Sequence, residues 1–203
     1  MAYPTVAGPY GLQPINLVGG QVYAGQVRQI PIASDASTDI FYGDIVALNT
    51  SGNLVKVTTT DAATNAIGVF LGCSYTNPST KQPLYYQCYD GPVTASDIMA
   101  FVQDDQDQLY KVAVVSATTT IGGVTRAAVG QNAALVQNTG STTTGDSGEG
   151  VTAPTAGAGN AVTLPVKVIS VVPETAVNAT NFSEVLVVLT NPQITRTTGN
   201  DFA

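Results

Sequence analysis

Short apolar runs dominate this sequence of 203 residues, and clusters of glycine, proline and asparagine separate them. The runs are rich in β-branched and aromatic residues, which favour strands, whereas the intervening clusters favour turns. The pattern predicts an all-β fold, either a compact β-barrel or a β-sandwich. The runs that we interpret as strands are residues 40–48, 54–57, 67–73, 84–89, 98–103, 109–115, 162–172 and 185–190.

Turn residues also predict how some of these strands pair. Residues 49–53 form a turn cluster, so we expect residues 40–48 and 54–57 to form a hairpin. We expect residues 98–103 and 109–115 to pair in the same way around an acidic turn at 104–107. Residues 126–137 are rich in alanine and predict at most one short helix, which Gly130 weakens.

The chain divides by composition into two parts. Residues 1–39 carry four prolines and five glycines, and we interpret them as an extended N-terminal arm. The arm also carries apolar residues that a disordered tail normally lacks, so we expect it to pack on its own domain or on a neighbouring subunit, with simple disorder as the remaining alternative. Residues 40–203 form the predicted β-rich domain. Within it, residues 138–159 are rich in glycine and threonine and predict a flexible, exposed loop.

Composition excludes several classes of function. The chain contains no histidine, which excludes a Ser-His-Asp triad, a Cys-His dyad and any histidine-ligated metal site. Seven basic residues against fourteen acidic ones give a net charge of −7, which argues against direct binding of nucleic acid. No apolar run approaches the roughly 20 residues that span a bilayer. The first residues lack the features of a secretory signal, so we expect synthesis in a host cytoplasm.

Two groups of acids are candidates for chemistry. Asp104, Asp105 and Asp107 could hold Ca²⁺, but the segment lacks the glycine and distal glutamate of a calcium loop, so we favour a solvated turn. The three glutamates, Glu149, Glu174 and Glu184, could supply a glycosidase pair. No sequence pattern brings two acids together, and Glu149 falls in the predicted loop. We therefore predict no enzyme activity, no catalytic or metal-binding residue, and no cofactor.

Cysteines and tyrosines gather on one predicted hairpin. A hairpin centred near Ser79 and Thr80 would place Cys73 opposite Cys88, where a cross-strand disulfide is possible. In a cytoplasm the two thiols would stay reduced. Tyr85, Tyr86 and Tyr89 form an aromatic cluster on the same hairpin. Such clusters can stack on sugars or nucleobases, but packing in a core or an interface is the default interpretation.

Several short segments resemble the capsid decoration (cement, or head-stabilising) proteins of tailed bacteriophages, of the marine or cyanobacterial type. These segments are residues 10–16, 20–25, 41–46, 67–70, 102–105, 110–112, 164–169 and 185–191. Together they span most of the chain, and none is a catalytic signature. The resemblance implies a virion structural protein on the capsid surface that binds the major capsid protein. It also implies a homo-oligomer, a trimer or alternatively a dimer.

The resemblance gives the N-terminal arm a possible role. A protein that bridges adjacent capsid subunits needs an extended segment that can lie along a neighbour. We therefore expect residues 1–39 to supply the capsid or intersubunit contact, with Tyr3, Tyr10, Leu12, Ile15 and Tyr23 as anchors. The alternative is a tail, fibre or host-attachment protein of the virion.

Overall fold

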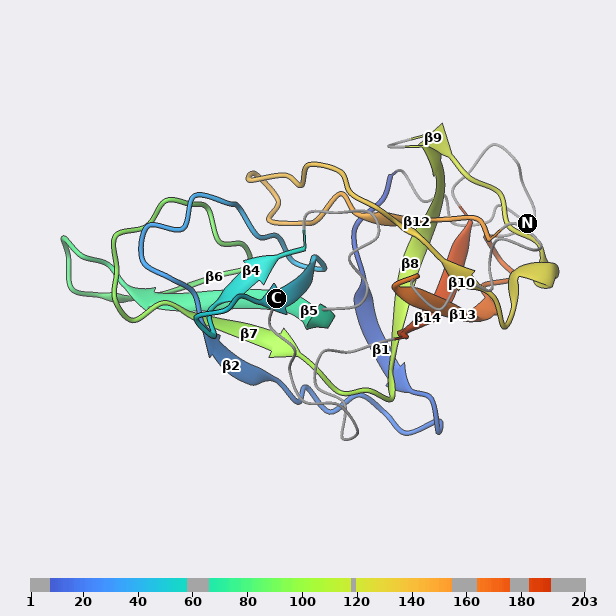
Figure 1. Ribbon diagram of the computed structural model, residues 1–203, viewed down its shortest axis with the longest axis horizontal. Coiled ribbons are helices and arrows are strands. Elements are labelled where there is room, and N and C mark those ends of the chain that lie inside the picture. The colour runs from blue at the N-terminus through green and yellow to red at the C-terminus, as the bar shows by residue number, and fades with distance from the viewer. Residues whose placement is uncertain (1–7, 58–65, 118–119, 155–163, 176–182, 191–203) are drawn as a thin grey trace.

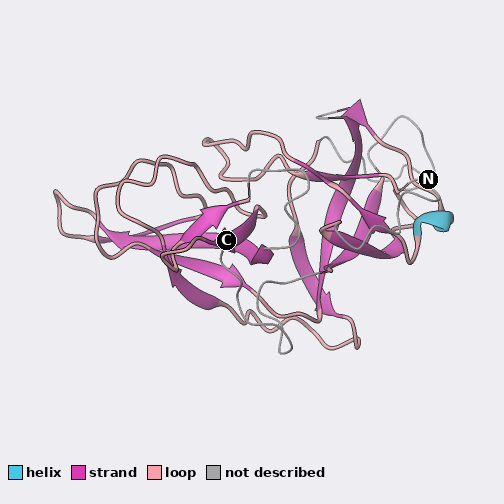
Figure 2. Cartoon of the chain, viewed as in Figure 1, coloured by secondary structure: helices cyan, strands magenta, loops and turns pink. Residues whose placement is uncertain are grey.

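The computed structural model describes residues 8–57, 66–117, 120–154, 164–175 and 183–190. These residues form an all-β structure of two sheets, with one short 3₁₀ helix, η2 (Arg126–Ala128), at the edge of the larger sheet (Figure 2). The predictions of an all-β, barrel-like fold and of at most one short helix are therefore confirmed. In the described part of the chain, no helix has the length and apolar character that spanning a bilayer requires.

The larger sheet nearly closes into a barrel. Its central path runs β10 (Asn132–Ala133), β13 (Val166–Val171), β14 (Glu184–Leu189), β8 (Gln108–Ala117), β12 (Gly150–Thr152) and β11 (Leu135–Val136). The first and last of these strands follow each other in one segment, and the backbone N–H of Thr152 donates to the Ala134 carbonyl between them at 2.9 Å. β8 pairs in addition with β1 (Gln13–Leu17) and β9 (Thr120–Ile121).

The second sheet lies beside the barrel along the long axis of the molecule (Figure 1). Its order is β2 (Arg28–Pro31), β7 (Met99–Gln103), β5 (Ala66–Thr76), β3 (Ile45–Leu48) and β4 (Leu54–Lys56). The short strand β6 (Pro83–Tyr86) pairs with the far end of β5. The expected hairpin of β3 and β4 is confirmed, with Ala47 opposite Val55.

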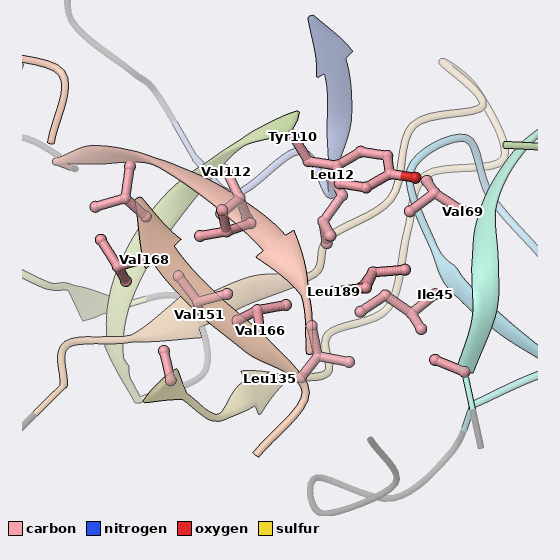
Figure 3. Packing of buried hydrophobic residues seen from close by; sticks show 14 of the residues in the cluster. Leu12, Ile45, Val69, Tyr110, Val112, Leu135, Val151, Val166, Val168 and Leu189 are labelled. Carbon is pink, nitrogen blue, oxygen red and sulfur yellow. The ribbon is translucent and has the colours of Figure 1, made fainter. Parts of the chain in front are cut away.

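The central strands of the second sheet, β3, β5 and β7, are largely buried on both faces. Ile45 and Val69 extend from one face into the barrel core, where they meet Leu12, Tyr110 and Leu189 (Figure 3). Side chains on the opposite face form a second core beneath the segments around Tyr89 and Ile98; they include Val46, Ile67, Phe70 and Val102. Burial on both faces explains why these strands read as continuous apolar runs, without the alternation of a half-exposed sheet.

The predicted pair formed by residues 98–103 and 109–115 is wrong. β7 pairs with β2 and β5 in the second sheet, whereas β8 belongs to the barrel. The acidic turn between them is the crossing from one sheet to the other, and the buried side chains of Gln103 and Gln108 are hydrogen-bonded there at 3.0 Å. Neighbouring apolar strands joined by a short turn satisfy a hairpin pattern, but here each strand pairs with strands that are more distant in sequence.

The N-terminal segment is integrated into both sheets. β1 pairs with β8, β2 pairs with β7, and Leu12 is fully buried. The described part of residues 1–39 is therefore not a separate arm, and it packs on its own chain. Between the two strands, residues 18–27 cross from one sheet to the other, and all are exposed except the half-buried Tyr23. We call residues 18–27 the crossover.

The predicted exposed loop at 138–159 is wrong for its centre. Ser147, Glu149 and Val151 are buried, and β12 pairs in parallel with β8. Glycine makes this burial possible, because a Cβ atom on Gly148 would lie 2.6 Å from the Thr139 carbonyl oxygen. The alanine-rich segment 126–137 likewise forms η2, β10 and β11, with Gly130 at a positive φ of 85° between them.

Substitution of Leu12 tests the integration of the N-terminal segment. Leu12→Ala removes a fully buried side chain from the core shared by both sheets. We expect the free energy of unfolding to fall by about 2–5 kcal/mol, measured by urea denaturation. Val22→Ala is the control, since Val22 is 81% exposed, and it should change stability by less than about 0.5 kcal/mol. Equal stability of both variants would contradict the packing described above.

Candidate functional site

Three segments cross where the barrel meets the second sheet. The Gly11 N–H donates to the Glu149 carbonyl at 2.9 Å, and the Leu12 N–H donates to the Gly43 carbonyl at 2.9 Å. The Ser147 N–H donates to the Tyr42 carbonyl, also at 2.9 Å. The crossing, which we call the junction, therefore joins the N-terminal segment, the approach to β3 and the approach to β12.

The junction requires glycine at position 11. Gly11 has a φ of 77°, and a Cβ atom there would lie 2.7 Å from both the Gly43 carbonyl oxygen and the Ser147 Cβ. Gly43 also has a positive φ, of 93°. Such backbone is strained for residues with a side chain. The close approach of the three backbones thus depends on glycine at these crossing points.

Four polar side chains are packed inside the junction: Asp44, Lys56, Ser147 and Glu149, which we call the junction cluster. The Lys56 Nζ lies 2.7 Å from Asp44 Oδ2 and 3.7 Å from Glu149 Oε1. Asp44 also accepts hydrogen bonds from the Phe41 N–H and the Ser147 hydroxyl, and Glu149 Oε2 accepts from the Ile45 N–H at 3.1 Å. Both carboxylates are fully buried, while the Lys56 side chain is 12% exposed.

Burial controls the protonation of Glu149. Desolvation raises its pKa well above the usual value, and the neighbouring Asp44 charge raises it further. Lys56 and the Ile45 N–H oppose this rise. Glu149 Oε1 has no hydrogen-bond partner among the described atoms, which fits a carboxyl group that is poorly compensated as an anion. We conclude that burial favours the protonated form of Glu149.

The junction cluster holds the fold together. Paired carboxylates with a raised pKa are a mark of acid–base sites when they line a cleft. Here neither carboxylate is exposed to solvent, so neither is accessible to a substrate in this conformation. The hydrogen bonds of the junction cluster instead connect residues more than 100 positions apart. The Ile45 N–H donates to Glu149, and the Ser147 hydroxyl donates to Asp44.

Sequence reasoning missed this cluster, because it placed Glu149 in an exposed loop. One signal was present in the sequence. Ser147, Glu149 and Val151 alternate with Gly148 and Gly150, which is the period of a strand with one buried face. In a chain with only 10% charged residues, a glutamate at an inward position of that pattern is a candidate for a buried charge.

A second polar contact holds the N-terminal segment on the barrel. The Tyr10 hydroxyl donates to Glu184 Oε1, and Lys111 Nζ lies 3.3 Å from the same oxygen. Lys111 Nζ also lies 5.5 Å from the centre of the Tyr10 ring. Burial is the largest cause of a raised Tyr10 pKa, so the hydroxyl stays protonated and remains a donor.

The structure separates the residues predicted as capsid anchors. Leu12 is in the core and Tyr10 is bonded to its own chain, so neither is free for a partner. Ile15 and Tyr23 are half-buried, and Tyr3 lies outside the described residues. The apolar side chains that are exposed in this region are Val18, Val22 and Val27, all in the crossover.

The acidic turn is tied to the second sheet. Arg28 Nε lies 2.9 Å from Asp104 Oδ2, and the Asp107 N–H donates to Asp105 Oδ1 at 2.9 Å. Across the ranges that the structure describes, no three acidic, cysteine or histidine side chains are close enough to hold a metal ion. Of the other two glutamates, Glu174 is exposed and Glu184 belongs to the Tyr10 contact.

The cysteine hairpin forms, but in a different register from the expected one. Cys73 lies opposite Tyr86, and Tyr75 lies opposite Leu84. The expected pairing of Cys73 with Cys88 is wrong by two residues. A hairpin turn centred between Ser79 and Thr80 places Cys73 opposite Tyr86, which is the observed pairing. Both cysteines are free thiols, and Cys73 Sγ donates to the Cys88 carbonyl at 3.5 Å.

The tyrosine cluster divides between core and surface. Tyr89 is buried in the second core, as the default interpretation expects. Tyr85 and Tyr86 are exposed on the edge strand β6, by 74% and 47%. Tyr86 stacks on Tyr75 with ring centres 5.7 Å apart.

Comparison of the chain with protein-family models, with curated proteins and with solved structures finds no match.

Removal of the Lys56 charge tests the junction cluster. Lys56→Met leaves Asp44 buried without its counterion, so we expect a loss of about 3–5 kcal/mol in unfolding free energy, measured by urea denaturation. Lys167→Met, at an exposed position on β13, should cost less than about 0.5 kcal/mol. Adding Asp44→Asn to Lys56→Met should recover part of the loss, because no unpaired charge is then buried. The junction cluster would not hold the fold if Lys56→Met and Lys167→Met were equally stable.

The raised pKa of Glu149 predicts a pH dependence of stability. Between its unfolded and folded pKa values, the folded protein keeps a proton that the unfolded chain has lost, so stability falls as pH rises through this window. Glu149→Gln cannot titrate, and its stability relative to the wild type should increase from pH 5 to pH 8 in urea melts. Glu174→Gln, at an exposed position, controls for the lost charge. A constant difference between Glu149→Gln and wild type would show that Glu149 is already ionised at pH 5.

Proposed function

We propose that this chain is a structural protein of a tailed-phage virion that binds the outer surface of the capsid and stabilises it by bridging neighbouring major capsid subunits. The proposal rests on the resemblance of short segments to capsid decoration proteins. Four of these segments, residues 10–16, 41–46, 102–105 and 110–112, lie at or beside the contact between the two sheets. Because the four segments share one location in the fold, they support the resemblance of a single folded unit. Unrelated short matches would have no reason to share a location.

The crossover is the observation that carries the proposal. It runs over the outside of the molecule between β1 and β2, and it exposes three valines within ten residues: Val18, Val22 and Val27. Both of its ends are fixed in sheets, so little ordering entropy is lost when it docks. An anchored, exposed and apolar segment is suited to lie along a neighbouring subunit. We therefore propose residues 18–27 as the capsid contact.

The large number of identical sites on a capsid supports the same role. A shell presents many identical sites, so a modest contact per site gives a large total stabilisation. The polar surface of this chain is mainly uncharged, and short polar side chains lose little entropy at an interface. The expected homo-oligomer, a trimer or a dimer, would increase the effect by linking several such contacts.

Copy number distinguishes the proposal from its alternative. In particles purified from the source that encodes this chain, quantitative mass spectrometry should give about one copy per major capsid subunit, because a decoration protein tiles the whole lattice. A few copies per particle would instead indicate a tail, fibre or host-attachment protein. Absence from the particle would refute both.

Substitutions in the crossover test the proposed contact. Val22→Asp and Val27→Asp place a charge in the predicted apolar interface, and we expect each to reduce co-sedimentation with purified capsids by about tenfold or more. Val129→Asp is the matched control, because Val129 is 41% exposed, Val27 is 40% exposed, and Val129 lies next to η2 on the barrel. If all three variants co-sedimented as the wild type does, the crossover would not be part of the capsid contact.

A further inference from the structure

A small hollow opens beside the exposed end of the second sheet. Its lining residues are Tyr75 on β5, Tyr86 on β6, Cys88 and Asp90 in the following segment, and Thr142. Its volume is about 250 Å³, slightly below the roughly 300–1,000 Å³ of pockets that bury a drug-sized ligand, so it can take only a small group. We call it the tyrosine pocket. The junction and the crossover contribute no residue to its lining.

Three segments hold the tyrosine pocket in shape. β5 and β6 pair along one side. Tyr89, between the lining residues Cys88 and Asp90, exchanges two backbone hydrogen bonds with Ile40. The turn that carries Thr142 is closed by a Gly145 N–H to Ser141 carbonyl bond of 2.7 Å. Gln87 Nε2 then donates to Asp146 Oδ1 at 2.7 Å, which fixes this turn to the end of β6. The pocket is therefore preformed.

The Tyr75 and Tyr86 rings are stacked, and the outer ring, Tyr86, forms a flat platform. Their planes differ by only 28°, and Tyr75 packs against the second core. Tyr86 remains 47% exposed, so part of its surface is available to a ligand. A sugar ring presents a face of C–H groups, and such a face packs well on the electron-rich face of an aromatic ring.

Polar groups surround this platform. Thr142 offers a hydroxyl group and Asp90 offers a carboxylate, both of which can hydrogen-bond to sugar hydroxyl groups. Burial and the negative charges of Asp90 and Asp39 raise the pKa of the Cys88 thiol, so the local field is negative. None of the lining residues is basic. This charge disfavours phosphate, sulfate and carboxylate ligands.

We propose that the tyrosine pocket binds one residue of a neutral glycan, with its ring stacked on Tyr86 and its hydroxyl groups hydrogen-bonded to Asp90 and Thr142. This activity is separate from the proposed capsid contact, which uses the crossover. It does not require the virion assignment to hold.

The geometry favours a sugar over the two other ligands that aromatic rings commonly bind. A nucleotide brings a phosphate, which the carboxylates repel. A quaternary ammonium or lysine side chain is best held by several ring faces that enclose it. Here the two rings are nearly parallel and stacked on each other, so they form a platform and do not enclose a cation.

Affinity electrophoresis tests the proposal directly. The net charge of −7 carries the protein into a native gel, and neutral polysaccharides can be cast in the gel as probes. The probes are dextran, galactomannan, xyloglucan and mixed-linkage β-glucan. We expect at least one of them to retard the wild-type protein, and we expect Tyr86→Ala to weaken this binding about tenfold, as loss of a stacking aromatic does for nucleobases. Tyr86→Phe keeps the ring and should retain binding.

Tyr85→Ala is the matched control. Tyr85 is the neighbouring residue on the same strand and is even more exposed, but it points to the opposite face of the sheet. It should bind as the wild type does. The proposal is overturned if none of the four polysaccharides retards the protein, or if Tyr85→Ala and Tyr86→Ala lose binding equally. Binding of polylysine in place of the neutral probes would overturn it in favour of a cation site.

Cys88 provides a second readout that locates the bound sugar. Of the two thiols, Cys88 is partly exposed in the pocket, whereas Cys73 is fully buried. A saturating oligosaccharide of the polysaccharide that binds should slow maleimide labelling of Cys88 at pH 8.5. Unchanged labelling would place the sugar elsewhere and refute the assignment. Capsid co-sedimentation by Tyr86→Ala should stay normal, so failure of this proposal is distinguishable from failure of the capsid proposal.

Discussion

The ion pair of Asp44 and Lys56 is the interaction on which the rest of this structure depends. It lies where three chain segments cross, and its carboxylate is fully buried. A buried pair of this kind contributes little net stability, but it strongly penalises any arrangement that leaves one charge alone. Because Ser147 and Glu149 complete the cluster, a correct fold must bring residues 44, 56 and 147–149 together. The cluster therefore specifies how the barrel and the second sheet are joined.

The two sheets bury their apolar side chains in different ways. The larger sheet nearly closes into a barrel, so most of its strands pair with one another, and its interior is apolar. The second sheet buries both faces of its central strands and leaves its far end, with β6 and the neighbouring turns, in solvent. The exposed features that we assign to binding, the crossover and the tyrosine pocket, lie outside these cores. A rigid interior that positions binding residues at the surface is a common division in proteins.

Several predictions failed at places where local sequence was ambiguous. The acidic turn looked like a hairpin turn, because the two flanking runs are apolar and close in sequence, and only packing shows that β7 and β8 enter different sheets. The glycine-rich segment looked like an exposed loop, because composition was weighed before the alternation of Ser147, Glu149 and Val151. The cysteine register failed by two residues, although the centre of the turn was predicted correctly.

The sequence by itself determined the class of the fold and most of its strands. Runs of β-formers broken by glycine, proline and asparagine leave few alternatives to an all-β structure, because local propensity and turn chemistry agree. Tertiary structure alone decided which strands are partners, where the N-terminal segment packs and which charges are buried. These outcomes depend on contacts between residues far apart in the chain, such as Gly11 with Glu149 and Asp44 with Ser147. No local pattern encodes such contacts, since their free energy arises only when the segments meet.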